Sequence, residues 1–194
     1  MPARAQRGKD FSVTVKQPAA GSPAEVGLYG TFEAAITLPT TATNPYWPYD
    51  ATPPGTVPPG TGISMDALFL PPGQTSWSAA KVQPCFWYQP MIEQDAERAS
   101  TLVATPAEAA HWRVRFAPDR IGTWKWKLRA TDGSGTRYSG EFSFNGIASA
   151  SRGFLRVSPG DRRYFEFADA RRSWPSGATR PTGEAFRLWP ARSI

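Results

Sequence analysis

The sequence predicts an all-β protein built as an antiparallel β-sandwich. The first reason is a pair of segments, WRVRF at 112–116 and WKWKLR at 124–129, in which apolar residues alternate with Arg or Lys. Side chains on a strand point to opposite faces with a period of two, so each segment has one apolar and one charged face. A second layer must cover the apolar faces. The second reason is composition, because 17 Gly and 20 Pro supply the many turns of an all-β domain.

Most elements of the first half are expected to be strands. Residues 1–24 are predicted to form a flexible lead, with a short strand candidate at 11–15. Strands are then expected in four segments, 25–38, 63–70, 74–81 and 84–88. The loop between the first two of these is rich in proline, which cannot donate to a β-ladder. No regular pairing is therefore expected in that loop.

The second half begins with the one segment that favours helix. Residues 91–110 are rich in Ala, Glu and Gln, so a short helix is allowed there. After the two alternating strands, Asp132-Gly133-Ser134-Gly135 predicts a hairpin turn, and the last strand of the sandwich is expected over 138–144. The sandwich is thus assigned to 25–148. Residues 149–169 form a β-rich linker, and residues 170–194, which lack any period, are predicted to be a disordered tail.

The distribution of charge argues against a nucleic-acid partner. The net charge is +6, but the excess lies in the first ten residues and in 171–194, which leaves the segment between them neutral. A nucleic-acid binder concentrates Lys and Arg on its folded module. The sequence also has no transmembrane span and no apolar core of a signal peptide, so we expect no membrane partner, and the localisation of this chain stays open.

The residue types that dominate catalytic centres are scarce. Cys85 and His111 are the only residues of their kinds, so we expect no disulfide, no metal, no cofactor and no Ser-His-Asp triad. His111 precedes a strand and is interpreted as a surface or edge residue. The carboxylates of Glu33, Glu141, Glu166 and Asp169 fall at strand edges or outward positions, where solvation is expected. We therefore predict that the chain is not an enzyme and has no catalytic residues.

Several segments together resemble a known domain family. They are GTFE at 30–33 with the following AAITLP, TNPY at 43–46, FWYQ at 86–89, the block at 112–132, and GFLRVSPGDRRYFEFAD at 153–169. The resemblance covers about 25–169. It is to the immunoglobulin-like N-terminal domain of unknown function that precedes apiosidase-like TIM-barrel domains in bacterial glycoside hydrolases. It implies an immunoglobulin-like β-sandwich, and the last of these segments resembles the junction that leads into the barrel.

The resemblance also implies a function. The chain is expected to be a non-catalytic accessory domain that packs beside a catalytic glycosidase domain and orients it, and intact relatives are expected to be secreted or cell-surface proteins. A TIM barrel needs about 250 residues, which the chain does not have after the junction, so it looks truncated or frame-shifted before the barrel. The side chains expected to dock on the missing domain are Phe154, Leu155, Tyr164, Phe165 and Phe167.

A second candidate site is a sugar-binding loop at 44–50, NPYWPYD. Aromatic rings bind sugars by stacking on the C–H face of a pyranose, while nearby polar groups bind the hydroxyls. The candidate residues are Asn44, Tyr46, Trp47, Tyr49 and Asp50, with polysaccharide as the partner. The favoured alternative is that these rings cover an open edge of the core. Trp112, Trp124 and Trp126 are interpreted as core, whereas Trp77 and Trp87 cannot be assigned to a face. An independent carbohydrate-binding module and a structural protein-interaction domain remain alternatives to the accessory role.

Overall fold

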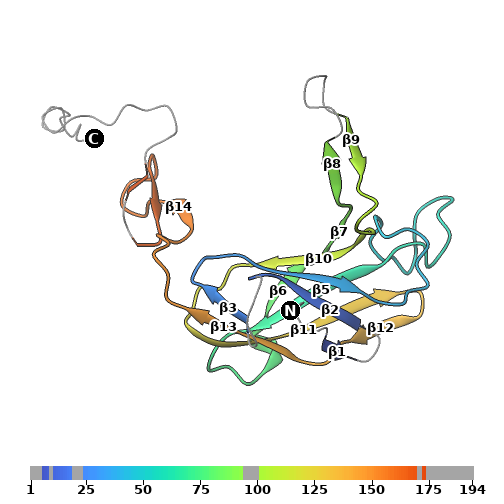
Figure 1. Ribbon diagram of the computed structural model, residues 1–194, viewed down its shortest axis with the longest axis horizontal. Helices are drawn as coiled ribbons and strands as arrows, with labels where there is room; N and C mark the ends of the chain where they lie inside the picture. The colour runs from blue at the N-terminus through green and yellow to red at the C-terminus, as the bar shows by residue number, and fades with distance from the viewer. Residues whose placement is uncertain (1–5, 9–10, 19–23, 94–100, 170–171, 174–194) are drawn as a thin grey trace, which may run out of the picture. The chain divides into compact units, whose positions relative to one another are not determined.

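The computed structural model describes residues 6–8, 11–18, 24–93, 101–169 and 172–173, which Figure 1 draws as coloured strands and loops. The chain divides into two compact units, Met1–Ser149 and Ala150–Ile194. The described residues form strands and one 3₁₀ turn, η1 (Trp77–Ala79), and no α-helix is found among them. The all-β prediction is confirmed. The predicted disordered tail lies outside the described residues except for Arg172–Ser173, which form a short strand, β16.

The first unit is a sandwich of two sheets. The first sheet has the order β1–β2–β4–β10–β7, formed by Gln6–Gly8, Phe11–Gln17, Phe32–Thr37, His111–Phe116 and Phe86–Tyr88. The second sheet has the order β3–β13–β11–β5–β6, formed by Ala24–Gly27, Phe142–Ile147, Gly122–Asp132, Ser64–Leu70 and Lys81–Pro84. Pairing is antiparallel except between β3 and β13, and β12 (Gly135–Tyr138) forms a hairpin with the end of β11.

The core lies between the two sheets and is strongly aromatic. The prediction that Trp112, Trp124 and Trp126 are buried is confirmed, because alternation along β10 and β11 turns one face of each strand inward. Phe32 of β4 joins the layers: its ring stacks on Phe144 at 4.6 Å and meets the edge of Trp126 at 5.2 Å. Such ring contacts add to the burial of apolar area that holds a sandwich together.

The strands begin earlier and break more often than predicted. Phe11 and Val13 of β2 are buried in the core, so the sandwich includes part of the segment assigned to a flexible lead. The expected continuous strand over 25–38 is two strands in different sheets. Its break is a tight turn at Tyr29, which has φ 60°, and Gly30, whose N–H donates to the carbonyl of Gly27 at 2.8 Å. The expected strand over 138–144 also breaks, because β12 ends at Tyr138 and β13 starts at Phe142.

The predicted strand over 74–81 is replaced by η1 and the start of β6. Where the sequence allowed a short helix over 91–110, the described parts, 91–93 and 101–110, contain strands and turns. β8 (Met91–Glu93) and β9 (Leu102–Ala104) pair as an antiparallel hairpin, while 94–100 lie outside the described residues. Figure 1 shows this hairpin extending from the sandwich beyond β7. Helix propensity is a weak prior that pairing easily overrides, and here Ile92 and Val103 face each other across the ladder.

The second unit contains a small antiparallel sheet of β14 (Leu155–Val157), β15 (Phe165–Phe167) and β16. Its two faces differ in chemistry. Arg156 and Glu166 are opposite each other in the register and form an ion pair at 2.9 Å, and Ser158 also donates to this carboxylate. The neighbouring pairs, Leu155 with Phe167 and Val157 with Phe165, therefore occupy the other face, because successive side chains alternate.

Candidate functional site

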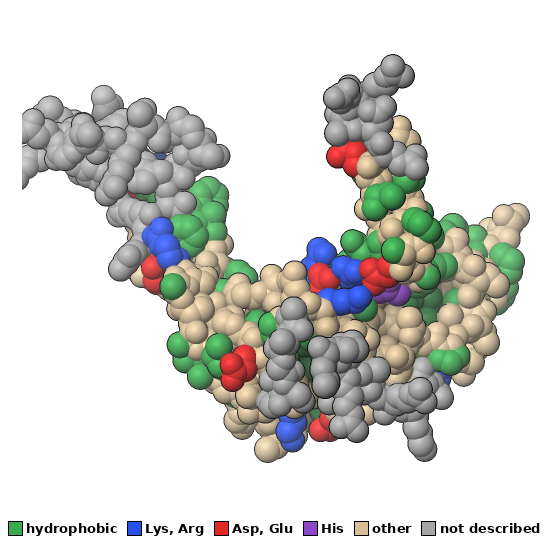
Figure 2. Space-filling view, viewed as in Figure 1, with side chains coloured by type: hydrophobic (Ala, Val, Ile, Leu, Met, Phe, Trp, Pro, Cys, Tyr) green, Lys and Arg blue, Asp and Glu red, His purple; other side chains and the backbone are tan. Residues whose placement is uncertain are grey.

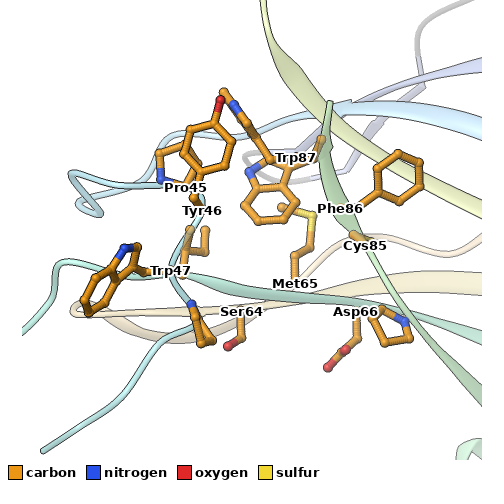
Figure 3. Close-up of a pocket in the computed structure, with 13 residues that line it drawn as sticks. Pro45, Tyr46, Trp47, Ser64, Met65, Asp66, Cys85, Phe86 and Trp87 are labelled. Carbon is orange, nitrogen blue, oxygen red and sulfur yellow. The ribbon is translucent and has the colours of Figure 1, made fainter. Parts of the chain in front are cut away.

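A cleft lined by aromatic residues lies at one end of the sandwich, where the chain passes from the second sheet to the first between β6 and β7. It has a volume of about 390 Å³. One wall is the loop segment 45–48, the other is Pro84–Trp87, and the start of β5 runs between them, as Figure 3 shows. Volumes of this order are typical of small-molecule sites. The complete set of lining residues is Pro45, Tyr46, Trp47, Pro48, Ile63, Ser64, Met65, Asp66, Pro84, Cys85, Phe86, Trp87 and Trp112.

Both walls of this aromatic cleft are tied to the start of β5, one through Ile63, which directly precedes the strand, and the other through Met65 within it. The N–H of Ile63 donates to the carbonyl of Trp47 at 2.9 Å, and two residues later the carbonyl of Met65 accepts from the N–H of Cys85 at 2.8 Å. The backbone also packs too closely for a larger residue at Gly62, where a Cβ would lie 2.2 Å from the carbonyl oxygen of Pro48. These contacts, together with the flanking prolines, hold the loop against β5 and fix the width of the cleft.

The rings of the loop remain open to solvent. Tyr46 is 71% exposed and Trp47 is 44% exposed. The favoured alternative, in which these rings cover an open edge of the core, therefore does not describe Tyr46 or Trp47. On the opposite wall, Trp87 packs against the core and meets the edge of Trp112 at 5.5 Å, which assigns a position that the sequence left open.

The other predicted sugar-binding residues have local roles. The side chain of Asn44 accepts from the N–H of Tyr46 at 3.0 Å, and that of Asp50 accepts from Thr52 at 2.8 Å, so both shape turns. Tyr49 is half-buried and does not line the cleft, although its N–H donates to the Ser64 hydroxyl. Asp50 instead lines a second hollow of about 210 Å³, which shares Trp47 and Pro48 with the first.

The polar side chains of the cleft come from β5. Ser64 and Asp66 leave the strand on one side and Met65 on the other, as alternation requires (Figure 3). Asp66 accepts a hydrogen bond from Arg129 at 2.6 Å, which neutralises its charge within the second sheet. Burial, with a smaller contribution from the Asp66 charge, raises the pKa of the Cys85 thiol far above its usual range, so this lining residue is held as the neutral thiol.

A separate cluster of charges lies on the outer face of the first sheet, centred on Glu33. Its carboxylate accepts from Arg113 at 2.6 Å and from Arg115, and Arg113 in turn donates to the ring of His111 at 2.9 Å. The guanidinium of Arg113 also lies 3.7 Å from the ring centroid of Tyr88. Figure 2 shows acidic and basic side chains gathered around the single histidine, below the β8–β9 hairpin.

This cluster corrects two expectations. Glu33 is 5% exposed and His111 is 6% exposed, where the sequence suggested solvated positions. Glu166, expected to be solvated too, is likewise buried beside Arg156. Long arginine side chains cover these groups. The partners of Glu33 lie 80 residues or more along the chain, so the local sequence gives no signal of its burial. Nε2 of His111 accepts from Arg113, and its Nδ1 lies 2.8 Å from the carbonyl oxygen of Ala109.

In the part of the chain that the structure describes, no group of three or more His, Cys, Asp or Glu side chains is placed to hold a metal ion. Within the same ranges, no helix combines the length and the apolar character needed for a membrane crossing.

The predicted docking residues lie in the second unit. Phe154, Leu155 and Phe165 are each about half exposed, at 46–53%, and Tyr164 and Phe167 are partly buried. Val157, which the sequence analysis did not include, is exposed on the same face as Leu155. The guanidinium of Arg152 lies 4.1 Å from the ring centroid of Phe167 and accounts for part of its burial.

Comparison with known proteins gives few relatives. Neither a protein-family model nor a curated protein matches the sequence. Among solved structures, the chain is similar to a "putative glycoside hydrolase from Bacteroides vulgatus ATCC 8482", with a TM-score of 0.46 and 19% identity over 78% of this chain and 22% of that one. An engineered protein is similar with a TM-score of 0.32 and 14% identity, over 76% of this chain and 21% of that one. The chain thus spans about a fifth of the length of each.

Proposed function

We propose that this chain is a non-catalytic accessory domain of a carbohydrate-active enzyme, which packs beside a glycoside hydrolase domain and orients it. The observation that carries the proposal is the apolar face of the β14–β15 sheet. It occurs in the segment that resembles the junction between such a domain and its catalytic barrel. The proposal therefore rests on two things: the resemblance of this segment to a junction, and an exposed apolar surface of the kind that a docked domain would cover.

The topology of the first unit supports an immunoglobulin-like class for this domain. In immunoglobulin-like sandwiches, strands A, B, E and D form one sheet, and G, F and C, extended by C′, form the other. When the eight strands of the orders β2–β4–β10–β7 and β13–β11–β5–β6 are lettered A, B, C, C′, D, E, F and G in chain order, the two orders become A–B–E–D and G–F–C–C′. The parallel contact of β3 with β13 adds one more strand beside the last.

The apolar face is suited to burial against a partner. Leu155, Val157 and Phe165 are exposed on one side of the sheet, while the ion pair of Arg156 and Glu166 occupies the other. Fully burying a side chain of this size contributes about 1.5–3 kcal/mol. Three such side chains together favour a stable contact with a catalytic domain over exposure to water.

The carboxylates of the described residues support a role without catalysis. Glycoside hydrolysis needs a carboxylic acid that stays protonated to donate to the leaving group. The three buried carboxylates, Glu33, Asp132 and Glu166, are each in contact with an arginine. Despite its burial, the hydrogen bonds of Ser134 and Thr40 and the charge of Arg137 lower the pKa of Asp132 to about 2, which is the wrong direction for a proton donor, while Glu33 and Glu166 are each engaged in ion pairs within the fold.

The test combines activity and docking measurements on the full chain. We expect no hydrolysis of aryl glycosides by the chain alone, and saturable binding to a separately produced apiosidase-like barrel domain in calorimetry. Phe165→Glu should weaken that binding by about tenfold or more, as loss of a buried interface anchor does. Ile121→Lys, at an exposed position of the first unit, is the matched control and should leave it unchanged. Hydrolysis by the chain alone would overturn the proposal, as would binding to the barrel domain that Phe165→Glu does not weaken, or no binding.

A further inference from the structure

The aromatic cleft of the first unit is a second site, distinct from the docking face. We infer that it binds a short stretch of a neutral glycan, with one pyranose ring stacked on Trp47. This inference does not depend on docking to a catalytic domain, because the cleft is formed within Met1–Ser149 and the apolar face within Ala150–Ile194. Each can therefore fail without the other.

The first argument is the display of aromatic rings beside a hollow. Tyr46 and Trp47 are both exposed although they are neighbours in a loop that is bonded to β5. A single exposed apolar side chain needs no explanation, but two consecutive ones at the mouth of a cleft of about 390 Å³ form a binding surface. The face of an aromatic ring carries partial negative charge, which attracts the polarised C–H groups on one side of a pyranose.

The second argument is the rigidity of this display. Prolines on both sides of the Tyr46–Trp47 pair restrict the backbone, and the hydrogen bonds of Asn44 with Tyr46 and of Ile63 with Trp47 fix it against β5. A ring held in place before binding loses less conformational entropy when the ligand arrives. The loop thus lowers the cost of recognising a small, flat ligand.

The third argument is the polar character of the rim. The Ser64 hydroxyl accepts from the N–H of Tyr49 and retains its own O–H as a donor. The carboxylate of Asp66 can accept from sugar hydroxyls, and its pairing with Arg129 leaves the cleft without net charge from this group. A ligand with many hydroxyls and no charge fits these groups best.

The alternative occupant, an extended peptide, fits less well. Peptides often bind by adding a strand to a sheet edge. At the start of β5 the groups that would pair with such a strand are in use, because Ile63 donates to Trp47 and Met65 accepts from Cys85. A ligand in the cleft would therefore be bound by the faces of aromatic rings and by side-chain hydroxyl and carboxylate groups.

The shape of the surface indicates more than one sugar unit. The second hollow of about 210 Å³ shares Trp47 and Pro48 with the cleft. A ligand stacked on Trp47 can thus extend into both hollows. We expect affinity to rise from a monosaccharide to an oligosaccharide of the same sugar.

The experiment is affinity electrophoresis of the full chain in gels that contain xyloglucan, arabinoxylan, galactomannan or laminarin, followed by calorimetry with oligosaccharides of the retarding glycan. Wild type should be retarded by at least one of them. Trp47→Ala should lower the affinity by about tenfold or more, as removal of a central aromatic contact does. The urea unfolding midpoint of the variant should match wild type, because the loop is anchored through the Trp47 backbone and not its ring.

Trp77→Ala is the matched control. Trp77 lies in η1, where Lys127 sits 4.1 Å from its ring centroid and its indole N–H donates to Glu141, and it does not line the cleft. Its removal should leave glycan affinity within about twofold of wild type. The inference is overturned if no glycan retards wild type, if both variants bind equally, or if a proline-rich peptide binds in the cleft and no glycan does.

Discussion

Replacing the carboxylate of Asp132 should destabilise the sandwich in a way that depends on pH. Asp132 is fully buried at the end of β11 and accepts hydrogen bonds from Ser134, Thr40 and Arg137. Ser134 donates through its N–H at 2.9 Å and its hydroxyl at 2.5 Å, while Thr40, in the segment after β4, donates through its hydroxyl at 2.7 Å. Arg137 of β12 adds a charged contact at 2.8 Å. One carboxylate thus joins the β11–β12 hairpin to the neighbouring loop.

The magnitude follows from the pKa of this group. Burial by itself would raise the pKa of Asp132, but the hydrogen bonds of Ser134 and Thr40 and the charge of Arg137 outweigh it and lower the pKa from 3.8 to about 2. A lowered folded-state pKa means that the ionised group stabilises the fold above pH 3.8, and that this contribution is lost as pH falls through about 2. The difference corresponds to about 2–3 kcal/mol at neutral pH.

The assay is urea unfolding, followed by the fluorescence of the buried tryptophans, of wild type and Asp132→Asn at neutral and acid pH. We expect the variant to be less stable by at least about 2 kcal/mol at neutral pH, and roughly two thirds of the linked difference to vanish by about pH 2.5. Asp119→Asn is the control, because Asp119 forms a partly exposed ion pair with Lys81 and should cost under about 1 kcal/mol. A difference between wild type and Asp132→Asn that stays constant over this pH range would refute the reasoning.

Three further outcomes are expected. Phe32→Ala, at a fully buried ring between the sheets, should lower the free energy of unfolding by about 3–5 kcal/mol in urea titrations, and a loss below about 1 kcal/mol would contradict the packing described. Glu33→Gln should cost about 3–5 kcal/mol, since it leaves two arginines without their carboxylate; stability equal to wild type would show that water replaces it. The Cys85 thiol should react with Ellman's reagent far more slowly in the folded chain than in urea, because burial raises its pKa, and equal rates would contradict this.

The sequence predicted the central strands well because their signal is local. Every second residue is apolar along β10 and along β11 from Trp124 to Ala130, and such alternation places all of these side chains on one face, which is the face that is buried. The same rule misled at 25–38, where alternation continues through the place at which the chain leaves one sheet for the other. Gly27 and Gly30 flank that turn in the sequence, and an isolated glycine in a strand pattern also fits a bulge.

The buried charges could not be predicted in this way. Glu33 and His111 occupy outward positions of their strands, which alternation assigns to solvent. Their burial depends on Arg113 of β10, which reaches Glu33 on the neighbouring strand β4 and stacks on Tyr88 of β7, the neighbour on the opposite side. The sign and spacing of these charges along the chain contain no indication of that arrangement.

The aromatic cleft lies between these two cases. The aromatic and proline content of the loop at 44–50 predicted a binding surface, and the structure leaves its Tyr46 and Trp47 rings exposed. The opposite wall could not be predicted, because the sequence around Phe86 and Trp87 has the pattern of an ordinary short strand. These residues face the loop because the chain passes from the second sheet to the first at Cys85. Since that passage also exposes the start of β5, the same topological step creates the wall, the floor and the polar rim. A change that straightened the chain at Cys85 would therefore remove the cleft while leaving the core of Trp112, Trp124 and Trp126 in place.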